Sequence, residues 1–449
     1  MTSDKPAPLM VAPFHLDSLR EPSGDQPEPR RRARRRGASS SHRRRRRRRR
    51  VLVPLVVLAV VVLAAGAFVG VRLSAAAPAP QVSSALPAAV KVPARTVPLP
   101  WPATGQGAVA VPSIGVEEAS GPEQPVPVAS LTKLMTTYVI LRDHPLAANE
   151  PGPNISVTQA DVDDYNHDTV SDDSNAQVSV GEQLTEQQVL GGLLVHSADN
   201  YADLLAMWDA GSIPAFVTKM NDAAAGLGMH QSNFADASGV DPKSVSTATD
   251  ILKVAGPDMA NPVVAAIVRN TSVTLPVAGT ISTYTPLLGL QGTIGVKSGF
   301  TSAAGGCDVL GVIRTVHGHP TLLLAAVTGQ TGVAALAQAG LHGLALVDAV
   351  QPLIGTTTML RSGVVAANVA SAGTTIDART TGSVSMLTWP GARATRVFHP
   401  VQHLSAQARR GARVGTVVVA VGTQRVAVPV RLSRDVPQRS LLQRLFSPS

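Results

Sequence analysis

A single cysteine, Cys307, occurs in the sequence, so no disulfide can form within the chain. The sequence has no His-Glu-x-x-His motif and no cluster of cysteine and histidine, the patterns typical of protein zinc sites. It contains no Gly-x-Ser-x-Gly segment, the turn that carries the nucleophile in α/β hydrolases. No internal repeat is evident. We therefore expect no metal and no other cofactor.

Positive charge is scarce outside the first 50 residues. Residues 1–50 carry 16 Lys or Arg and 5 Asp or Glu, a net charge of +11, whereas the rest of the chain carries 23 against 25, a net of −2. The unbroken run Arg43–Arg50 lies in a segment rich in proline, serine and glycine. Such a run repels itself and cannot bury apolar surface, so we predict that residues 1–50 are a disordered tail.

An uncharged stretch of 21 residues, Val51–Val71, follows the arginine run. It is long enough to cross a bilayer as one helix, and the positive charge before it holds that flank in the cytoplasm. We predict a single-pass signal anchor in the cell membrane, with the rest of the chain outside. A cleaved signal peptide is the alternative, since Ser74–Ala77 offers small residues for cleavage. A basic run can also bind nucleic acid, but we expect the membrane to be its partner.

The rest of the chain divides by pattern. Residues 72–104 are rich in alanine and proline and predict a linker. Residues 105–350 alternate strand and helix patterns and predict an α/β domain. Residues 355–433 consist of short β-branched runs, including a candidate hairpin around Gly422–Thr423, and predict a small antiparallel β domain. Residues 434–449 are left as a tail.

Lysine is rare enough that each context can be compared. Of seven lysines, only Lys133 has a serine three residues before it, Ser130. Positions i and i+3 share one face of a helix, so the hydroxyl and the amine can meet. A serine hydroxyl is a weak nucleophile until a neighbouring base takes its proton. The pair is a candidate nucleophile and base, although a capping serine followed by a surface lysine fits this pattern equally well.

Two further segments complete a recurring order. Lys297-Ser298-Gly299 follows an apolar run suited to a strand, and its cation and hydroxyl suit a carboxylate. Between the two lysines lies His196-Ser197-Ala198-Asp199-Asn200, where Ser197 could relay a proton. We do not expect His196 to be a base, because it cannot turn toward its immediate neighbour. The serines and lysine of the three segments are 67 and 100 residues apart in the chain.

The order S-x-x-K, S-x-[ND], K-[ST]-G resembles the three signatures of the penicillin-recognising serine enzymes. Residues 105–350 are similar to the D-alanyl-D-alanine carboxypeptidases of the S11 type, low-molecular-mass penicillin-binding proteins, in an actinobacterial form. The resemblance also extends to three segments between and beyond the motifs: Asn233–Gly239, Thr247–Asp250 and Ala304–Cys307. It implies an α/β penicillin-binding fold, an antiparallel sheet flanked by helices with a helical subdomain, followed by an accessory β domain.

The resemblance assigns roles to the matched residues. Ser130 is the implied nucleophile, Lys133 the general base and Ser197 the proton relay, with Asp199 at the third position of the middle motif. The implied substrate-binding residues are Lys297, Ser298, Gly299, Phe300, Thr301 and Asn200. The implied substrates are peptidoglycan stem peptides ending in D-alanine, with β-lactams as inhibitors. The balance between hydrolysis and transfer to an acceptor amine stays open.

The sequence departs from the family's motifs at two positions, and two other functions are alternatives to the one that the resemblance implies. The middle motif usually has asparagine third, so either Asp199 replaces the amide or a register change lets Asn200 serve; a carboxylate there would weaken Lys133 as a base. Ser298 stands for the commoner threonine and keeps the hydroxyl. A β-lactamase-like hydrolase would need a glutamate after the middle motif, whereas Glu150 precedes it. The second alternative is a catalytically weak membrane protein that binds peptidoglycan.

Overall fold

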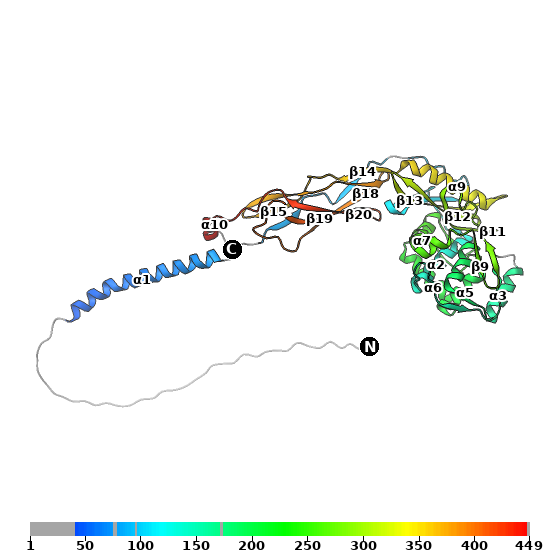
Figure 1. The fold of residues 1–449 in the computed structure, drawn as a ribbon, viewed down its shortest axis with the longest axis horizontal. Coiled ribbons are helices and arrows are strands. Elements are labelled where there is room, and N and C mark those ends of the chain that lie inside the picture. Colours follow the sequence, from blue (N-terminus) through cyan, green and yellow to red (C-terminus); the bar gives the residue numbers. More distant parts are fainter. Residues whose placement is uncertain (1–40, 75–78, 95–96, 171–173, 447–449) are drawn as a thin grey trace, which may run out of the picture. The chain divides into compact units, whose positions relative to one another are not determined.

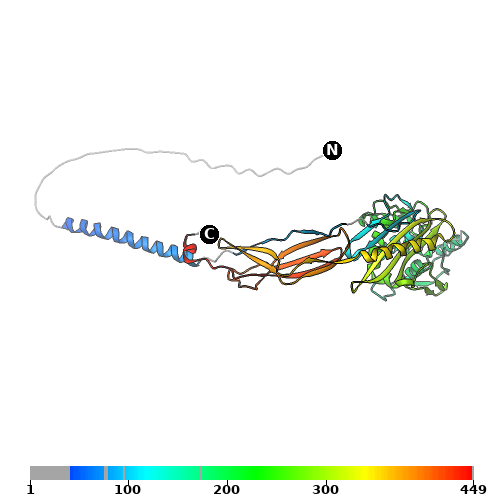
Figure 2. The same cartoon turned by 90° about the horizontal axis from the view of Figure 1, so that it is seen from above.

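The computed structural model describes residues 41–74, 79–94, 97–170 and 174–446. The described residues fall into two units, one with residues 41–74 and 441–446 and the other with the described residues from 79 to 440. Each is described by itself (Figures 1 and 2). Most of the predicted disordered tail, residues 1–40, and the possible cleavage residues 75–77 lie outside the described residues, as do the last three residues of the predicted C-terminal tail.

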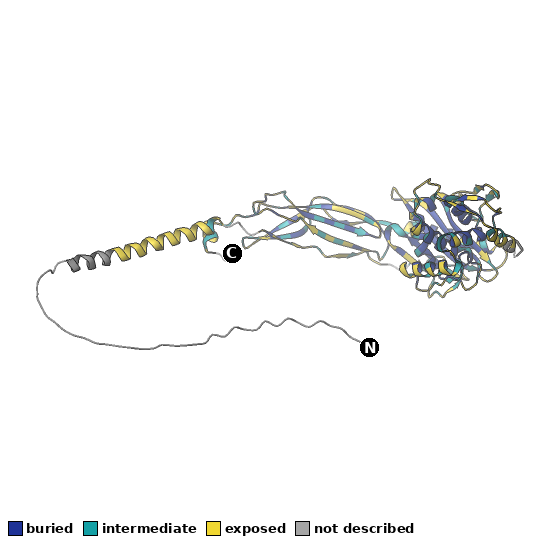
Figure 3. Ribbon diagram, turned by 90° about the horizontal axis from the view of Figure 1, so that it is seen from below, coloured by how far each residue is buried: buried dark blue, intermediate teal, exposed yellow. Residues whose placement is uncertain are grey.

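The first unit contains a long helix, α1 (Ser41–Ser74), and a short one, α10 (Leu441–Phe446). The Leu52–Ser74 part of α1 is long and apolar enough to cross a membrane by length and composition, and all of its residues are exposed except Arg72 and Leu73, which are half-buried (Figure 3). The helix begins ten residues before the predicted span. Residues 41–50, predicted as disordered, are therefore helical, because the helical backbone of the apolar segment continues into the arginine run.

A five-stranded antiparallel sheet with the order β11-β12-β13-β3-β4 forms the centre of the second unit. Alternate residues of each strand point to opposite faces, so Ala108 and Ala110 of β3 join one buried cluster while Val109 and Val111 join another. The strands are β3 (Gln106–Val111), β4 (Val116–Ala119), β11 (Thr293–Thr301), β12 (Gly305–Val316) and β13 (His319–Gln330). The long strands β12 and β13 pair along most of their length.

Helices cover both faces of this sheet, and Figure 2 shows α9 (Ala335–Val350) lying across one of them. The other face packs on a helical region through a large apolar cluster. The helices of that region are α2 (Thr132–Asp143), α3 (Gln159–Val170), α4 (Glu186–Val195), α5 (Asp199–Ala210), α6 (Ile213–Gly226), α7 (Ala248–Ala260) and α8 (Pro262–Ile267). Thr185 and Gln188 form a capping box at the start of α4, which fixes where that helix begins.

Short two-stranded ladders connect these helices. They are β5 (Val126–Pro127) with β8 (Val245–Ser246), β6 (Asn154–Ser156) with β7 (Gln183–Thr185), and β9 (Ser272–Leu275) with β10 (Gly279–Ser282). The fold class predicted from the resemblance, an antiparallel sheet with flanking helices and a helical subdomain, is confirmed.

A second sheet, of seven strands, accounts for most of residues 355–433. Its order is β1-β15-β16-β20-β19-β18-β2. The strands are β1 (Gln81–Ser84), β2 (Ala89–Lys91), β15 (Val365–Ser371), β16 (Thr374–Thr380), β18 (Arg393–Pro400), β19 (Arg413–Val421) and β20 (Gln424–Leu432), with β14 (Gly355–Leu360) and β17 (Val384–Thr388) pairing beside them. The predicted hairpin around Gly422 is confirmed as β19–β20.

The predicted linker 72–104 is partly wrong, because β1 and β2 both belong to this β sheet. Gln81 to Ser84 pair with β15, and Ala89 to Lys91 pair with β18. These strands are three and four residues long, too short to produce a visible alternation, and the sheet edges that they complete are formed by residues almost 300 positions later. The β region therefore begins near Gln81 and is not continuous in sequence.

Candidate active site

Ser130 lies in a 3₁₀ turn, η2 (Ala129–Leu131), that leads directly into α2. Ala129 before it has φ of +48°, a left-handed conformation that non-glycine residues seldom adopt and that is typical of strained functional turns. The turn packs against Gly239, where a Cβ atom would lie within 2 Å of the Ala129 carbonyl oxygen. The hydroxyl of Ser130 is thus held at the start of α2, on the same face as Lys133 one turn later.

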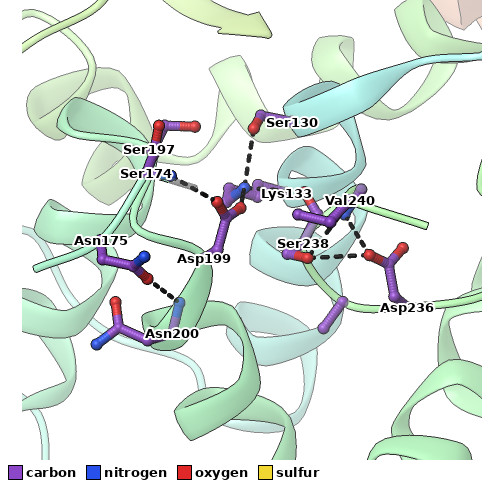
Figure 4. Close-up of polar contacts among 12 residues, drawn as sticks. Ser130, Lys133, Ser174, Asn175, Ser197, Asp199, Asn200, Asp236, Ser238 and Val240 are labelled. Atoms are coloured by element: carbon purple, nitrogen blue, oxygen red, sulfur yellow. Dashed lines mark hydrogen bonds and ion pairs between the residues drawn. The ribbon is translucent and has the colours of Figure 1, made fainter. Parts of the chain in front are cut away.

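The Lys133 ammonium is fully buried and lies at the centre of three acceptors (Figure 4). Its Nζ is 2.9 Å from Ser130 Oγ, 2.5 Å from Asp199 Oδ1 and 2.8 Å from the Ser238 carbonyl oxygen. A neutral amine in this position would donate two protons to Asp199 and Ser238 and turn its lone pair toward Ser130. The predicted nucleophile and base therefore meet in hydrogen-bond geometry.

Asp199 and Asn200, the two candidates for the third position of the middle motif, point in different directions. The Asp199 carboxylate accepts from Lys133 through Oδ1 and from the Ser174 amide through Oδ2, at 3.1 Å. Asn200 instead donates to the Ala176 carbonyl and accepts from the Ala176 amide. Asp199 therefore takes the place beside the base, and Asn200, predicted as substrate-binding, secures the neighbouring loop.

Lys297 of β11 lies beside Ser197, 100 residues earlier in the chain. Its Nζ is 2.9 Å from Ser197 Oγ and 2.7 Å from the Ser298 carbonyl oxygen, and the side chain is buried. Burial, and secondly the charge of Lys133, lower the pKa of Lys297 to about 7. Ser197 has φ of +67°, a second strained position in the site. The three predicted motifs thus form one constellation.

The strand β11 runs close to the nucleophile because residue 299 is glycine. A Cβ atom there would lie 2.7 Å from the Ser130 amide nitrogen, closer than side chains approach. Ser298 Oγ donates to the Tyr284 carbonyl oxygen at 3.2 Å, and Phe300 is 58% exposed. Thr301 turns away and accepts from the Ala304 amide. Of the predicted binding residues, Lys297, Ser298 and Gly299 lie in the site, while the Thr301 hydroxyl closes the turn after β11.

Four contributors were not predicted from the sequence. The Ser238 carbonyl holds Lys133, and Ser238 is itself fixed because its hydroxyl donates to Asp236 Oδ2 at 2.9 Å (Figure 4). Ser174 holds Asp199 through its amide, and Tyr284 accepts from Ser298. All but Asp236 act through backbone groups, which carry no sequence signal, although Ser238 and Asp236 fall in a segment that the resemblance covered.

His196 is occupied elsewhere, as expected. Its Nδ1 is 2.8 Å from the Ser282 carbonyl oxygen, and its ring stacks on Tyr284 with centroids 4.8 Å apart. Glu150 also lies away from the site. It lines a pocket with Glu186, which lies in the first turn of α4. Ser197 follows the other end of this ten-residue helix, which is about 15 Å long. Glu150 therefore cannot activate a water at Ser130.

Comparison with known proteins identifies the sequence region that carries this site. The family model described as D-alanyl-D-alanine carboxypeptidase, Peptidase S11, matches residues 116–329. A D-alanyl-D-alanine endopeptidase of Haemophilus influenzae is 35% identical over 130 residues, 29% of this chain and 41% of the relative. A D-alanyl-D-alanine carboxypeptidase of Streptomyces sp. K15 is 28% identical over 211 residues, 41% of this chain and 70% of the relative. The chain thus spans less than half of the first of these relatives.

Solved structures resemble a larger part of the chain. Penicillin-binding protein 5 of Haemophilus influenzae superposes with a TM-score of 0.55 at 19% identity and covers 76% of this chain and 99% of its own. Penicillin-binding protein 6B of Escherichia coli gives a TM-score of 0.54 at 21% identity, with 75% and 96% covered. At these identities the likeness concerns the fold alone. It covers about three quarters of the chain, more than the residues 116–329 that match the S11 family model.

Proposed function

Residues 116–329 of this chain belong to the S11 family of D-alanyl-D-alanine carboxypeptidases, and on that premise we propose that the protein is a serine peptidase that removes the terminal D-alanine from peptidoglycan stem peptides. The observation that carries the proposal is the contact of Lys133 Nζ with Ser130 Oγ at 2.9 Å, in a site that also contains the buried Lys297. No other pair of serine and lysine in the chain has the S-x-x-K spacing.

This geometry supports an acylation step. Ser130 Oγ attacks the carbonyl carbon of the penultimate D-alanine while its proton passes to Lys133. The backbone N–H groups of Ser130 and Phe300 stabilise the developing oxyanion, each contributing about 3 kcal/mol. When the C–N bond breaks, Ser197 gives its hydroxyl proton to the leaving amine and takes a replacement from Lys297, whose Nζ is 2.9 Å from Ser197 Oγ. The carbonyl carbon is then an ester on Ser130, and free D-alanine leaves.

The terminal carboxylate of the substrate is recognised by Lys297 and Ser298. An arriving carboxylate favours the charged form of Lys297, which burial otherwise disfavours. A water molecule then hydrolyses the ester and regenerates Ser130. β-Lactams acylate the same hydroxyl because their strained amide and carboxylate imitate the D-Ala-D-Ala end.

Anchoring by α1 would place this reaction at the outer surface of the cell membrane. The apolar residues 52–74 and the arginines before them support a single-pass anchor with the catalytic region outside. Stem peptides are on that side of the membrane, so location and substrate agree.

The proposed activity is tested with the full chain in detergent and a diacetylated tripeptide ending in D-Ala-D-Ala. Release of free D-alanine is expected from the wild type and is lost in Lys133→Ala. Lys219→Ala is the matched control, because Lys219 is a partly exposed lysine that pairs with Asp143 and Asp209 away from the site. Equal release from wild type and Lys133→Ala would refute the assignment.

A further inference from the structure

The near-neutral charge of the folded part conceals two strongly charged regions of opposite sign. Residues 105–350 carry 8 Lys or Arg against 23 Asp or Glu, a net charge of −15. Residues 355–449 carry 12 arginines, no lysine and only two acidic residues, Asp377 and Asp435, a net of +10. A surface that carries charge of one sign, all of it arginine, attracts anions and is typical of sites that bind phosphate groups.

Strand register brings three of these arginines into one line. Arg379 of β16 pairs with Arg431 of β20, and Arg431 pairs with Arg413 of β19. We call these three residues the arginine row. Directly opposite residues of antiparallel strands share one face, with Cβ atoms about 5 Å apart. All three are exposed, while their chain neighbours Ala378, Leu432 and Val414 are buried, so the row lies on the solvent face of the sheet.

Three more exposed arginines flank the row. Arg409 and Arg410 lie in the loop before β19, which is tied to the row because Arg431 donates to the Gly411 carbonyl at 2.7 Å. Arg361 lies in the turn whose carbonyl accepts from the Thr380 hydroxyl, next to Arg379.

Few carboxylates balance this cluster. Among the described residues, Asp377 is the only carboxylate that forms an ion pair with the row, with Arg379 at 2.8 Å. Asp435 is turned to the Arg410 backbone amide. Like charges directly opposite each other on neighbouring strands are destabilising, and an anion between them would remove that repulsion while accepting bidentate hydrogen bonds.

We propose that the arginine row is a docking surface for the anionic phosphate headgroups of the membrane in which α1 is anchored. The inference rests on the proposed membrane anchoring. Gln81, the first residue of β1, follows Ser74, the end of α1, by seven positions, and a chain of this length spans at most about 25 Å. Tethering at this distance gives a high effective concentration, so weak contacts to single headgroups suffice.

The charge division gives this contact a consequence for catalysis. The basic β region is attracted to an anionic surface and the acidic catalytic region is repelled by it. Docking by the arginine row would therefore favour orientations in which the catalytic region stays away from the lipid headgroups, where the stem peptides of the cell wall lie.

The test uses the full chain in lipid nanodiscs that contain a headgroup-linked quencher, made with phosphatidylcholine alone or with added phosphatidylglycerol. Gln407→Cys places a fluorophore on an exposed residue of the flanking loop, and the native Cys307 is buried and does not compete for label. The test variant is R379Q/R413Q/R431Q. The matched control is R393Q/R425Q/R434Q, which removes three exposed arginines of the same region outside the row and therefore the same charge.

Quenching is expected in the anionic discs and not in the neutral ones, and it should weaken in high salt. In the row variant the ratio of quenched to unquenched chain should fall about 100-fold, roughly five-fold per arginine. In the control variant this ratio should stay close to that of the wild type. Equal quenching in neutral discs, or equal losses in the two variants, overturns the proposal. The proposal is also overturned if a soluble glycerol-phosphate oligomer binds the row in neutral discs while anionic discs cause no quenching. That result would identify a free polymer as the ligand.

Two controls separate this proposal from its premises. If the chain dissociates from discs of every lipid composition, it lacks the membrane anchor. The docking proposal is then overturned, because it rests on that anchor. Release of D-alanine from the soluble tripeptide should be the same in the row variant and the wild type, since the row does not contact the active site. A loss of quenching with unchanged release therefore concerns docking alone.

Discussion

Asp199→Asn tests how the acidic residue beside the base controls the reaction. The carboxylate contacts Lys133 at 2.5 Å with side-chain exposures of 7% and 0%, so the contact is shielded from water. An amide can still accept from Lys133 but carries no charge. Hydrogen bonds to charged groups contribute about 1.5–3 kcal/mol and neutral ones about 0.5–1.5 kcal/mol, so the substitution removes about 1.4 kcal/mol of preference for the ammonium.

Since Lys133 must accept the proton of Ser130, a weaker preference for the ammonium should speed acylation by about 10-fold at neutral pH. The second-order rate of labelling by a fluorescent penicillin measures this directly. Asn200→Asp is the matched control, because it adds a carboxylate at the adjacent residue, whose side chain contacts the loop at Ala176 and not Lys133. It should not accelerate labelling.

The substitution also has a structural cost. Asp199 accepts from both Lys133 and the Ser174 amide, whereas asparagine offers a single oxygen to the two donors. The melting temperature of Asp199→Asn should therefore fall by a few degrees, by the equivalent of about 1 kcal/mol. Slower labelling in a variant that remains folded would refute the reasoning and show that the carboxylate itself assists the proton transfer.

Three further outcomes follow from the same geometry. Gly299→Ala should slow penicillin labelling by about 100-fold with the chain still folded, because its Cβ would displace Ser130, and labelling at the wild-type rate would contradict the close approach of β11. The kcat/KM for the tripeptide should fall about ten-fold per pH unit above about pH 7, where free Lys297 loses its proton, and a flat profile would show that its charge is not needed. Burial raises the pKa of Asp308 from 3.8 to about 8. Because the folded-state pKa is the higher one, the folded protein loses stability as the pH rises from about 4 to 8. Asp308→Asn should therefore raise the melting temperature above pH 8 and change it little near pH 4.

Much of the site could be predicted from the sequence because its side chains occur in short segments with fixed spacing. Ser130 and Lys133 are one helical turn apart, and Lys297 to Gly299 occupy one strand, so local geometry limits where they point. The choice between Asp199 and Asn200 could not be made, because it depends on the loop of Ser174 and Ala176. The contribution of Ser238 was missed because it acts through its carbonyl, and any residue has one.

The limits of the fold prediction have similar causes. Long, regular segments such as α9 and the β12–β13 pair have enough residues for their periodicity to be recognised. The strands β1 and β2 have seven residues together and obtain their hydrogen bonds from β15 and β18, so nothing local marks them. The arginine row was overlooked for the same reason. Arg413 lies 34 residues after Arg379, and Arg431 lies 18 residues after Arg413, so only the strand register makes them neighbours.

The central claim is that Ser130, primed by Lys133, forms an ester with its substrate. The most direct measurement is mass spectrometry of peptides from the full chain after a short incubation with benzylpenicillin. One penicilloyl group is expected on the peptide that contains Ser130, and none on any peptide of a Ser130→Ala chain. An unmodified Ser130 peptide in a folded protein, or a label that persists in Ser130→Ala, would contradict it.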